Sequence, residues 1–182
     1  MVLFVDACVR EDSRTKKLAS ALLTKLNEDT VHVPLKEISF DITDDIYLKK
    51  RDNLIAKGAL DDDMFALARQ FANANTIVIA APYWDLSFPA MLKQYIEAIN
   101  VLGITFEYTE EGFPKGLCKA EKLYYIMTAG GNYVPEEFGF GYIKALAQNF
   151  YGIRDVELIK ATGLDIMGAD SEAILCEAIN NL

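Results

Sequence analysis

Short apolar segments alternate along the chain with longer segments in which apolar residues recur every three or four positions. Runs rich in apolar and β-branched residues predict strands at residues 2–6, 30–35, 76–81, 123–128 and 156–161. The third run, Thr76 to Ala81, is apolar without interruption. This is typical of a central parallel strand that is covered on both faces.

Helical periodicity fills the intervals between these runs. Leu18, Leu22 and Leu26 recur at a spacing of four residues within 13–27, as a helix lying on a sheet requires. Further helices are expected at 44–57, at 62–74, from about Phe88, at 139–151 and at 170–181. Helical crossovers between strands place helices on both faces of a doubly wound parallel sheet. We therefore expect an α/β fold with a five-stranded parallel sheet, in a single domain of residues 1–182.

One stretch fits neither pattern. Residues 101–120 separate a predicted helix from the fourth strand and contain Gly103, Gly112, Pro114 and Gly116. Irregular stretches of this length in compact domains are usually functional.

Composition and charge narrow the classes of function. The chain carries 27 acidic and 18 basic side chains, a formal net charge of −9, which disfavours nucleic acid as a partner. No apolar run approaches the roughly 18 residues that a membrane span needs. The single histidine, His32, leaves little room for a histidine metal site or a Ser-His-Asp triad. Cys8, Cys118 and Cys176 form no paired motif, which favours reduced thiols and a cytoplasmic location.

The turn after the first predicted strand is the first candidate site. Ser13 and Thr15 lie at the start of a helix, where free N–H groups and the positive end of the helix dipole favour a phosphate. Arg10 or Arg14 would neutralise the charge of that phosphate. Ordinary helix capping by Asp12 or Ser13 is the competing interpretation.

Two more candidate segments follow predicted strands. Residues 82–85 contain Tyr83 and Trp84, whose large aromatic side chains suit a planar ring; aromatic core packing would also account for them. Residues 128–131 end in Gly130 and Gly131, and paired glycines let backbone amides approach a ligand closely, although a plain turn has the same composition. Ligands of open α/β sheets bind beyond the carboxyl ends of the strands, so we expect all these segments to form one site.

The phosphate turn also limits the kind of ligand. Residues 7–15 contain no glycine, and residues 139–144 lack the last glycine of G-x-G-x-x-G. The chain therefore has neither a Walker loop nor a dinucleotide fingerprint, and a mononucleotide monophosphate fits better than ATP or a Rossmann-bound NAD.

In their order along the chain, these segments resemble the FMN-dependent NADH-azoreductase and NAD(P)H:quinone reductase family. Residues 13–15 are similar to its S-x-[ST] phosphate turn, and residues 82–86 to its P-M-Y-N-F ring segment. The following residues 90–95 are similar to T-Q-L-K-N-Y. The most specific match is residues 103–117, which are similar to G-V-T-F-x-Y-T-x-x-G-x-x-G-L. Residues 128–131 match T/S-x-G-G.

The resemblance implies a flavodoxin-like fold with strand order 2-1-3-4-5 and bound FMN. It implies an enzyme that takes hydride from NADH or NADPH and reduces a quinone-like or azo acceptor by a ping-pong route. The expected cofactor-binding residues are Arg10, Ser13, Arg14, Thr15, Pro82, Tyr83, Trp84, Asp85, Thr128, Ala129, Gly130 and Gly131. The flavin carries the chemistry, and Tyr133 is the best candidate for a polar group near its ring.

The sequence departs from the family in places, and two alternatives stay open. Ala7 or Cys8 stands where the family has an early serine, and Ala129 stands where it has an arginine, so a preference for azo substrates does not carry over. One alternative is a flavodoxin-type electron carrier without NAD(P)H turnover. The other is a regulatory domain that binds no flavin. The resemblance also implies a homodimer, for which Met91, Tyr95 and Ala98 would offer an apolar face.

Overall fold

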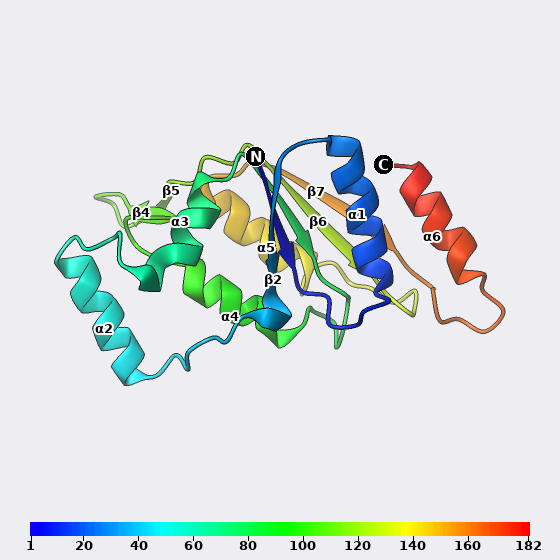
Figure 1. Ribbon diagram of the computed structural model, residues 1–182, viewed down its shortest axis with the longest axis horizontal. Coiled ribbons are helices and arrows are strands. Elements are labelled where there is room, and N and C mark those ends of the chain that lie inside the picture. The colour runs from blue at the N-terminus through cyan, green and yellow to red at the C-terminus, as the bar shows by residue number, and fades with distance from the viewer.

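The computed structural model describes residues 1–182 and has a five-stranded sheet at its centre (Figure 1). Its strands are β1 (Val2–Asp6), β2 (Thr30–Pro34), β3 (Thr76–Ala80), β6 (Lys122–Thr128) and β7 (Asp155–Ala161). They lie in the order β2-β1-β3-β6-β7, and every neighbouring pair is parallel. Val2 of β1 is level with Thr30 on one side and Thr76 on the other. The predicted parallel sheet and its strand order 2-1-3-4-5 are confirmed.

Helices cover both faces of this sheet (Figure 1). One face carries α1 (Arg14–Leu26) and α6 (Ser171–Asn180), and the other carries α3 (Ala66–Asn73), α4 (Ala90–Ile99) and α5 (Phe140–Leu146). Two apolar clusters fill the two interfaces, with 12 buried residues on the α1 side and 26 on the α4 side. Strand β3 supplies both clusters, since Val78 packs on the α1 side and Ile77 on the α4 side. No helix has the length and apolar content needed to cross a membrane.

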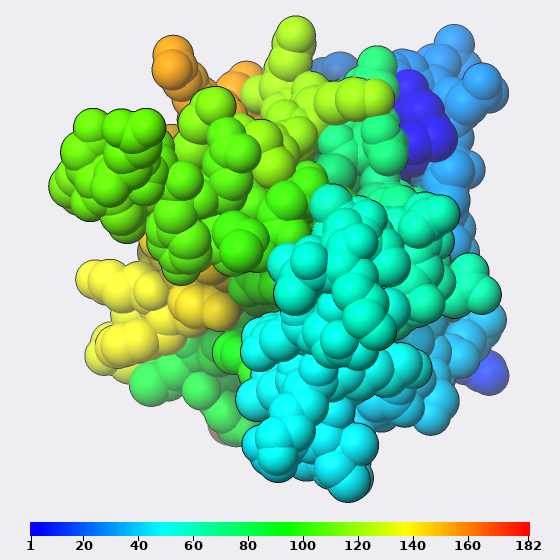
Figure 2. All heavy atoms as spheres, turned by 90° about the vertical axis from the view of Figure 1, so that its left-hand side faces the viewer, coloured from blue at the N-terminus to red at the C-terminus, as the bar shows by residue number.

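Helix α2 (Asp45–Ala56) differs from the other helices because none of its residues is buried. It stands away from the sheet in Figure 1, and its cyan residues form a projecting ridge in Figure 2. Ile46 on this helix and Ile42 just before it are 77% and 82% exposed. These two large apolar side chains therefore face solvent in the isolated chain.

The stretch 101–120 is more regular than the sequence suggested. It contains a small antiparallel hairpin formed by β4 (Phe106–Tyr108) and β5 (Pro114–Gly116). A side chain at Gly116 would overlap the backbone of Tyr151 and Gly152, so only glycine permits this close approach. The hairpin is thereby fixed against the end of the helical segment that follows α5.

Several predicted helices begin or end irregularly. The segment 62–74 starts with a 3₁₀ turn, η2 (Asp63–Phe65), before α3, and another 3₁₀ turn, η1 (Leu35–Glu37), follows β2. The segment 139–151 changes after α5 into a π-helical turn, η3 (Ala147–Tyr151), and ends at Gly152 with φ 80°. The helix expected from about Phe88 begins at Ala90, with Pro89 at its N-cap.

The prediction that Met91, Tyr95 and Ala98 of α4 form a contact face is wrong for Tyr95. Tyr95 is fully buried and packs edge-on against Phe71 of α3, with ring centroids 6.4 Å apart. Because α3 lies beside α4 on the same face of the sheet, the second apolar side of α4 belongs to the core. Tyr95 is therefore not available to a partner.

Candidate functional site

A cavity of about 440 Å³ opens at the carboxyl ends of β1, β3, β6 and β7. Its lining includes the predicted residues Arg10, Ser13, Arg14, Thr15, Pro82, Tyr83, Trp84, Thr128, Ala129 and Gly130. The predicted residues Asp85 and Gly131 are not part of the lining, and neither is Tyr133, which is 81% exposed. The structure thus brings the three predicted segments to one place.

The N-terminus of helix α1 forms one wall of the cavity. Ser13 is the N-cap, and its hydroxyl accepts a hydrogen bond from the amide of Lys16 at 3.3 Å. Ser13, and not Asp12, is therefore the capping residue. The first amides of a helix have no partner within the helix, and the dipole makes this end positive. This wall combines the properties that favour a bound anion.

Thr15 connects this wall to the next one. Its Oγ1 lies 2.6 Å from Oγ1 of Thr128 at the end of β6, and both side chains are buried. The hydroxyl that was expected to face a phosphate is therefore already hydrogen-bonded within the protein. This contact holds the start of α1 against the strand that leads into Gly130.

The aromatic segment forms a second wall. The amide of Tyr83 donates to the carbonyl oxygen of Thr128 at 3.0 Å, and the Tyr83 hydroxyl donates to that of Pro135 at 3.1 Å. Trp84 and Ser87 close a tight turn with reciprocal backbone hydrogen bonds. Asp85 and Leu86 occupy the middle of this turn with φ values of 51° and 65°. The turn leaves Trp84 40% exposed in the lining and places Asp85 outside it.

The glycine segment after β6 is held by the loop that follows β7. The carbonyl oxygens of Ala129, Gly130 and Gly131 accept hydrogen bonds from the amides of Leu164, Asp165 and Gly163. The amides of Gly130 and Gly131 donate to no group of the protein. A side chain at Gly130 would overlap the Asp165 carboxylate, whereas one at Gly131 would meet nothing within 4 Å. Of these two glycines, only Gly130 lies where an added side chain would have to displace a neighbour, the Asp165 carboxylate.

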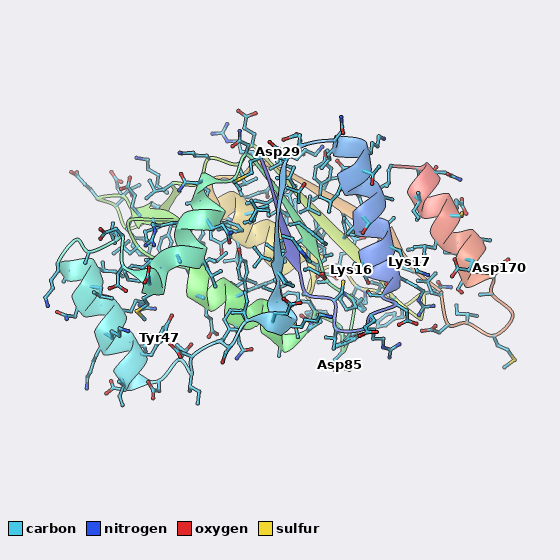
Figure 3. The ribbon with its side chains drawn as sticks, in the orientation of Figure 1. Lys16, Lys17, Asp29, Tyr47, Asp85 and Asp170 are labelled. Carbon is cyan, nitrogen blue, oxygen red and sulfur yellow. The ribbon has the colours of Figure 1, made fainter.

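The loop after β7 also contributes a charged group that the sequence analysis missed. Asp165 lies in the cavity lining, and its carboxylate pairs with Nη2 of Arg14 at 2.8 Å. Lys17 and Glu172 are two more lining residues outside the predicted set, and they lie 3.7 Å apart. Figure 3 shows Lys17 near the start of α1 and Asp170 at the start of α6, the two helix ends that border this region. Since Asp165 and Glu172 follow the fifth parallel strand, the rule that strand ends meet at one edge was the signal that could have found them.

The buried carboxylate of Asp6, with Lys16 and His32 around it, lies beside the turn at residues 7–15. The carboxylate of Asp6, at the end of β1, is 1% exposed and accepts hydrogen bonds from Lys16 Nζ at 2.8 Å, His32 Nε2 at 3.1 Å and the Cys8 amide at 3.0 Å. Burial alone would raise the pKa of Asp6, but these donors hold the pKa below its ordinary value. Burial raises the pKa of the neighbouring Cys8 thiol to about 12. Cys8 is therefore a neutral packing residue at neutral pH and not a nucleophile.

Known proteins that are similar to this chain bear the names of FMN-dependent oxidoreductases. A model of the family described as having the flavodoxin-like fold matches residues 1–182. A protein of Clostridium perfringens named FMN-dependent NADH:quinone oxidoreductase is 37% identical, over 98% of this chain and 93% of its own length. A protein of Clostridium acetobutylicum named FMN-dependent NADH:quinone oxidoreductase 2 is 36% identical, over 98% and 94%.

A solved structure supports the same grouping. The crystal structure of an azoreductase from Bacillus anthracis superposes with a TM-score of 0.84 and is 26% identical, covering 99% of this chain and 95% of its own.

Proposed function

Because the chain belongs to the flavodoxin-like fold family along residues 1–182, we propose that it is an FMN-dependent NADH:quinone oxidoreductase whose flavin binds in the cavity at the strand ends. The observation that carries this proposal is the convergence of the capped helix α1, the aromatic turn at Trp84 and the glycine segment at Gly130, whose amide donates to no group of the protein, on that cavity. The relatives bear the names of reductases, which supports an enzyme over the alternative of an electron carrier.

In this proposal, different groups of the lining would hold the phosphate and the ring system of FMN. The unpaired first amides of α1, with Ser13 and Arg10 beside them, would hold the phosphate. The amides of Gly130 and Gly131, which donate to nothing in the protein, would donate to the polar edge of the ring system. Trp84 and Tyr83 would cover its flat face.

FMN, when bound, would supply the redox chemistry by accepting hydride from NADH and passing the electrons to the acceptor. The protein's own residues would bind the cofactor and orient it. The contact between Thr15 and Thr128 keeps the start of α1, here called the phosphate wall, at a fixed distance from residues 129–131, here called the amide wall. The turn closed by Trp84 and Ser87 holds the aromatic side chain at the cavity. In this proposal the lining residues hold and position the cofactor, which carries the chemistry.

A quinone is the acceptor class that the relatives support. The structural neighbour is an azoreductase, and azo reduction is the second candidate activity. Trp84, which is 40% exposed in the cavity lining, suits flat aromatic acceptors of either kind. NADH is the nicotinamide in the relatives' names and is the proposed donor here.

The assembly we propose is a cytoplasmic homodimer. Helix α2 has no buried residue, and large apolar side chains at Leu86, Tyr133 and Phe138 are 42%, 81% and 56% exposed. Exposed large apolar side chains of this kind favour association. All three cysteines are free thiols, in keeping with a reducing compartment. Size-exclusion chromatography with light scattering should give the mass of a dimer. The mass of a monomer would contradict this assembly.

Flavin binding and turnover test the proposed function together. The purified protein is mixed with FMN, freed of excess flavin, and supplied with NADH and a benzoquinone. We expect bound FMN and NADH oxidation that depends on the quinone. Protein that retains FMN but does not oxidise NADH would favour the electron carrier, and protein that takes up no FMN would favour a domain without flavin.

A further inference from the structure

The cationic side chains around the cavity are not equally available to a ligand. Arg10, Arg14 and Lys17 all line it. Arg10 forms no ion pair, whereas Arg14 pairs with Asp165 and Lys17 lies 3.7 Å from Glu172. Both acidic partners come from the segment after β7. The carboxylates of Asp165 and Glu172 thus offset part of the positive charge at the phosphate wall.

The pair between Arg14 and Asp165 is fixed more firmly than a pair of free surface side chains. Arg14 donates through Nη2 to Asp165 at 2.8 Å and through Nη1 to the carbonyl oxygen of Leu164 at 3.1 Å. The backbone of Asp165 is held in turn, because its amide donates to Gly130 at 2.9 Å. These hydrogen bonds hold the Asp165 carboxylate next to Gly130, in the cavity lining.

We propose that Asp165 is a specificity-determining residue of the flavin site. Its carboxylate occupies Arg14 and repels a second anion, so it lowers the preference of the site for a phosphorylated flavin over the same flavin without phosphate. This inference rests on the proposed function, since it needs the FMN phosphate to bind at the start of α1. The Asp165 side chain thereby controls how much the phosphate group contributes to the affinity for FMN.

The expected size of the effect follows from charge and exposure. Asp165 is 64% exposed, so water and salt screen its repulsion of the phosphate. Between two charges several ångströms apart under such screening, removing one changes affinity by about three- to tenfold. The ribityl and ring parts of the flavin carry no charge, so riboflavin is insensitive to this change.

Asp165→Asn is the informative variant because it removes the charge, keeps the size and keeps an oxygen that accepts from Arg14. Asp155→Asn is the matched control. Asp155 is 62% exposed and also lies in an ion pair, with Lys122 at 3.4 Å, but at the opposite end of β7. Affinities for FMN and riboflavin are measured for each protein by quenching of flavin fluorescence, at low and at high salt.

Asp165→Asn should bind FMN about three- to tenfold more tightly than the wild type at low salt, with riboflavin affinity unchanged. The gain should shrink at high salt, and Asp155→Asn should change neither affinity. Equal FMN affinity in wild type and Asp165→Asn, or a weaker one, would overturn the inference while leaving the proposed function standing. A wild type that binds FMN no better than riboflavin, and gains nothing in Asp165→Asn, would overturn the phosphate site and the inference together.

Discussion

The hydroxyl of Thr15 on helix α1 lies 2.6 Å from the hydroxyl of Thr128 at the end of strand β6, and both side chains are buried. The two residues are far apart in sequence and belong to different predicted segments. Their contact sets the distance between the phosphate wall and the amide wall of the cavity.

Thr15→Val should lower the free energy of unfolding by about 1–3 kcal/mol, because it leaves the Thr128 hydroxyl buried without a partner. Thr128→Val should act similarly, and the double variant should lose clearly less than the sum of the two. Denaturant unfolding of the four proteins measures this coupling. Thr24→Val, on the exposed side of α1, should stay within about 0.5 kcal/mol of the wild type. Additive losses would show that the two hydroxyls do not interact.

An added side chain meets a neighbour at position 130 and not at position 131. Gly130→Ala should displace the Asp165 carboxylate and lower the free energy of unfolding by about 1 kcal/mol, at the low end of the cost of overpacking. Gly131→Ala should change it by less than about 0.5 kcal/mol, because its added methyl group meets nothing. Denaturant unfolding compares the two variants. The same loss in both would mean that the close contact at Gly130 does not shape the site.

Asp6 should give the protein part of its stability at neutral pH. Its pKa in the folded protein lies below the ordinary value of 3.8, so its contribution is complete above that value and is lost as the pH falls towards the lowered pKa. Asp6→Asn should therefore cost about 1.5–3 kcal/mol near neutral pH, and the difference from the wild type should narrow below about pH 4.

Urea unfolding across this pH range measures that difference, and Asp61→Asn is the control because Asp61 is exposed and forms no hydrogen bond through its side chain. A constant difference between wild type and Asp6→Asn at every pH would contradict the ionic role of Asp6.

Trp84 should contribute to binding the ring and not the phosphate. Trp84→Ala should weaken FMN and riboflavin binding equally, by about 0.5–1.5 kcal/mol or more, through loss of aromatic stacking. Trp84→Phe should restore most of the loss. Fluorescence titration with both flavins separates this effect from one on the phosphate wall. A loss confined to FMN would place Trp84 on the phosphate side of the cavity.

Much of this arrangement was predictable from the sequence because local patterns determine it. The uninterrupted apolar run at 76–81 identified the central strand, and turn chemistry located the three segments that meet at the cavity. The missing features depend on tertiary partners. The pairing of Thr15 with Thr128, the burial of Tyr95 against Phe71 and the reach of Asp165 to Arg14 join residues whose proximity no periodicity encodes. The hairpin at 106–116 escaped prediction because its strands have three residues each, too few for a period to be recognised.

Anaerobic titration of the FMN-loaded protein with NADH, followed by a benzoquinone, tests the central claim most directly. The visible flavin absorbance should bleach in proportion to the NADH added and return in proportion to the quinone. Initial rates against NADH at several quinone concentrations should give parallel lines, as expected when the two substrates react in turn. Flavin absorbance that NADH leaves unchanged, in protein that holds FMN, would contradict the assignment as an NADH:quinone oxidoreductase.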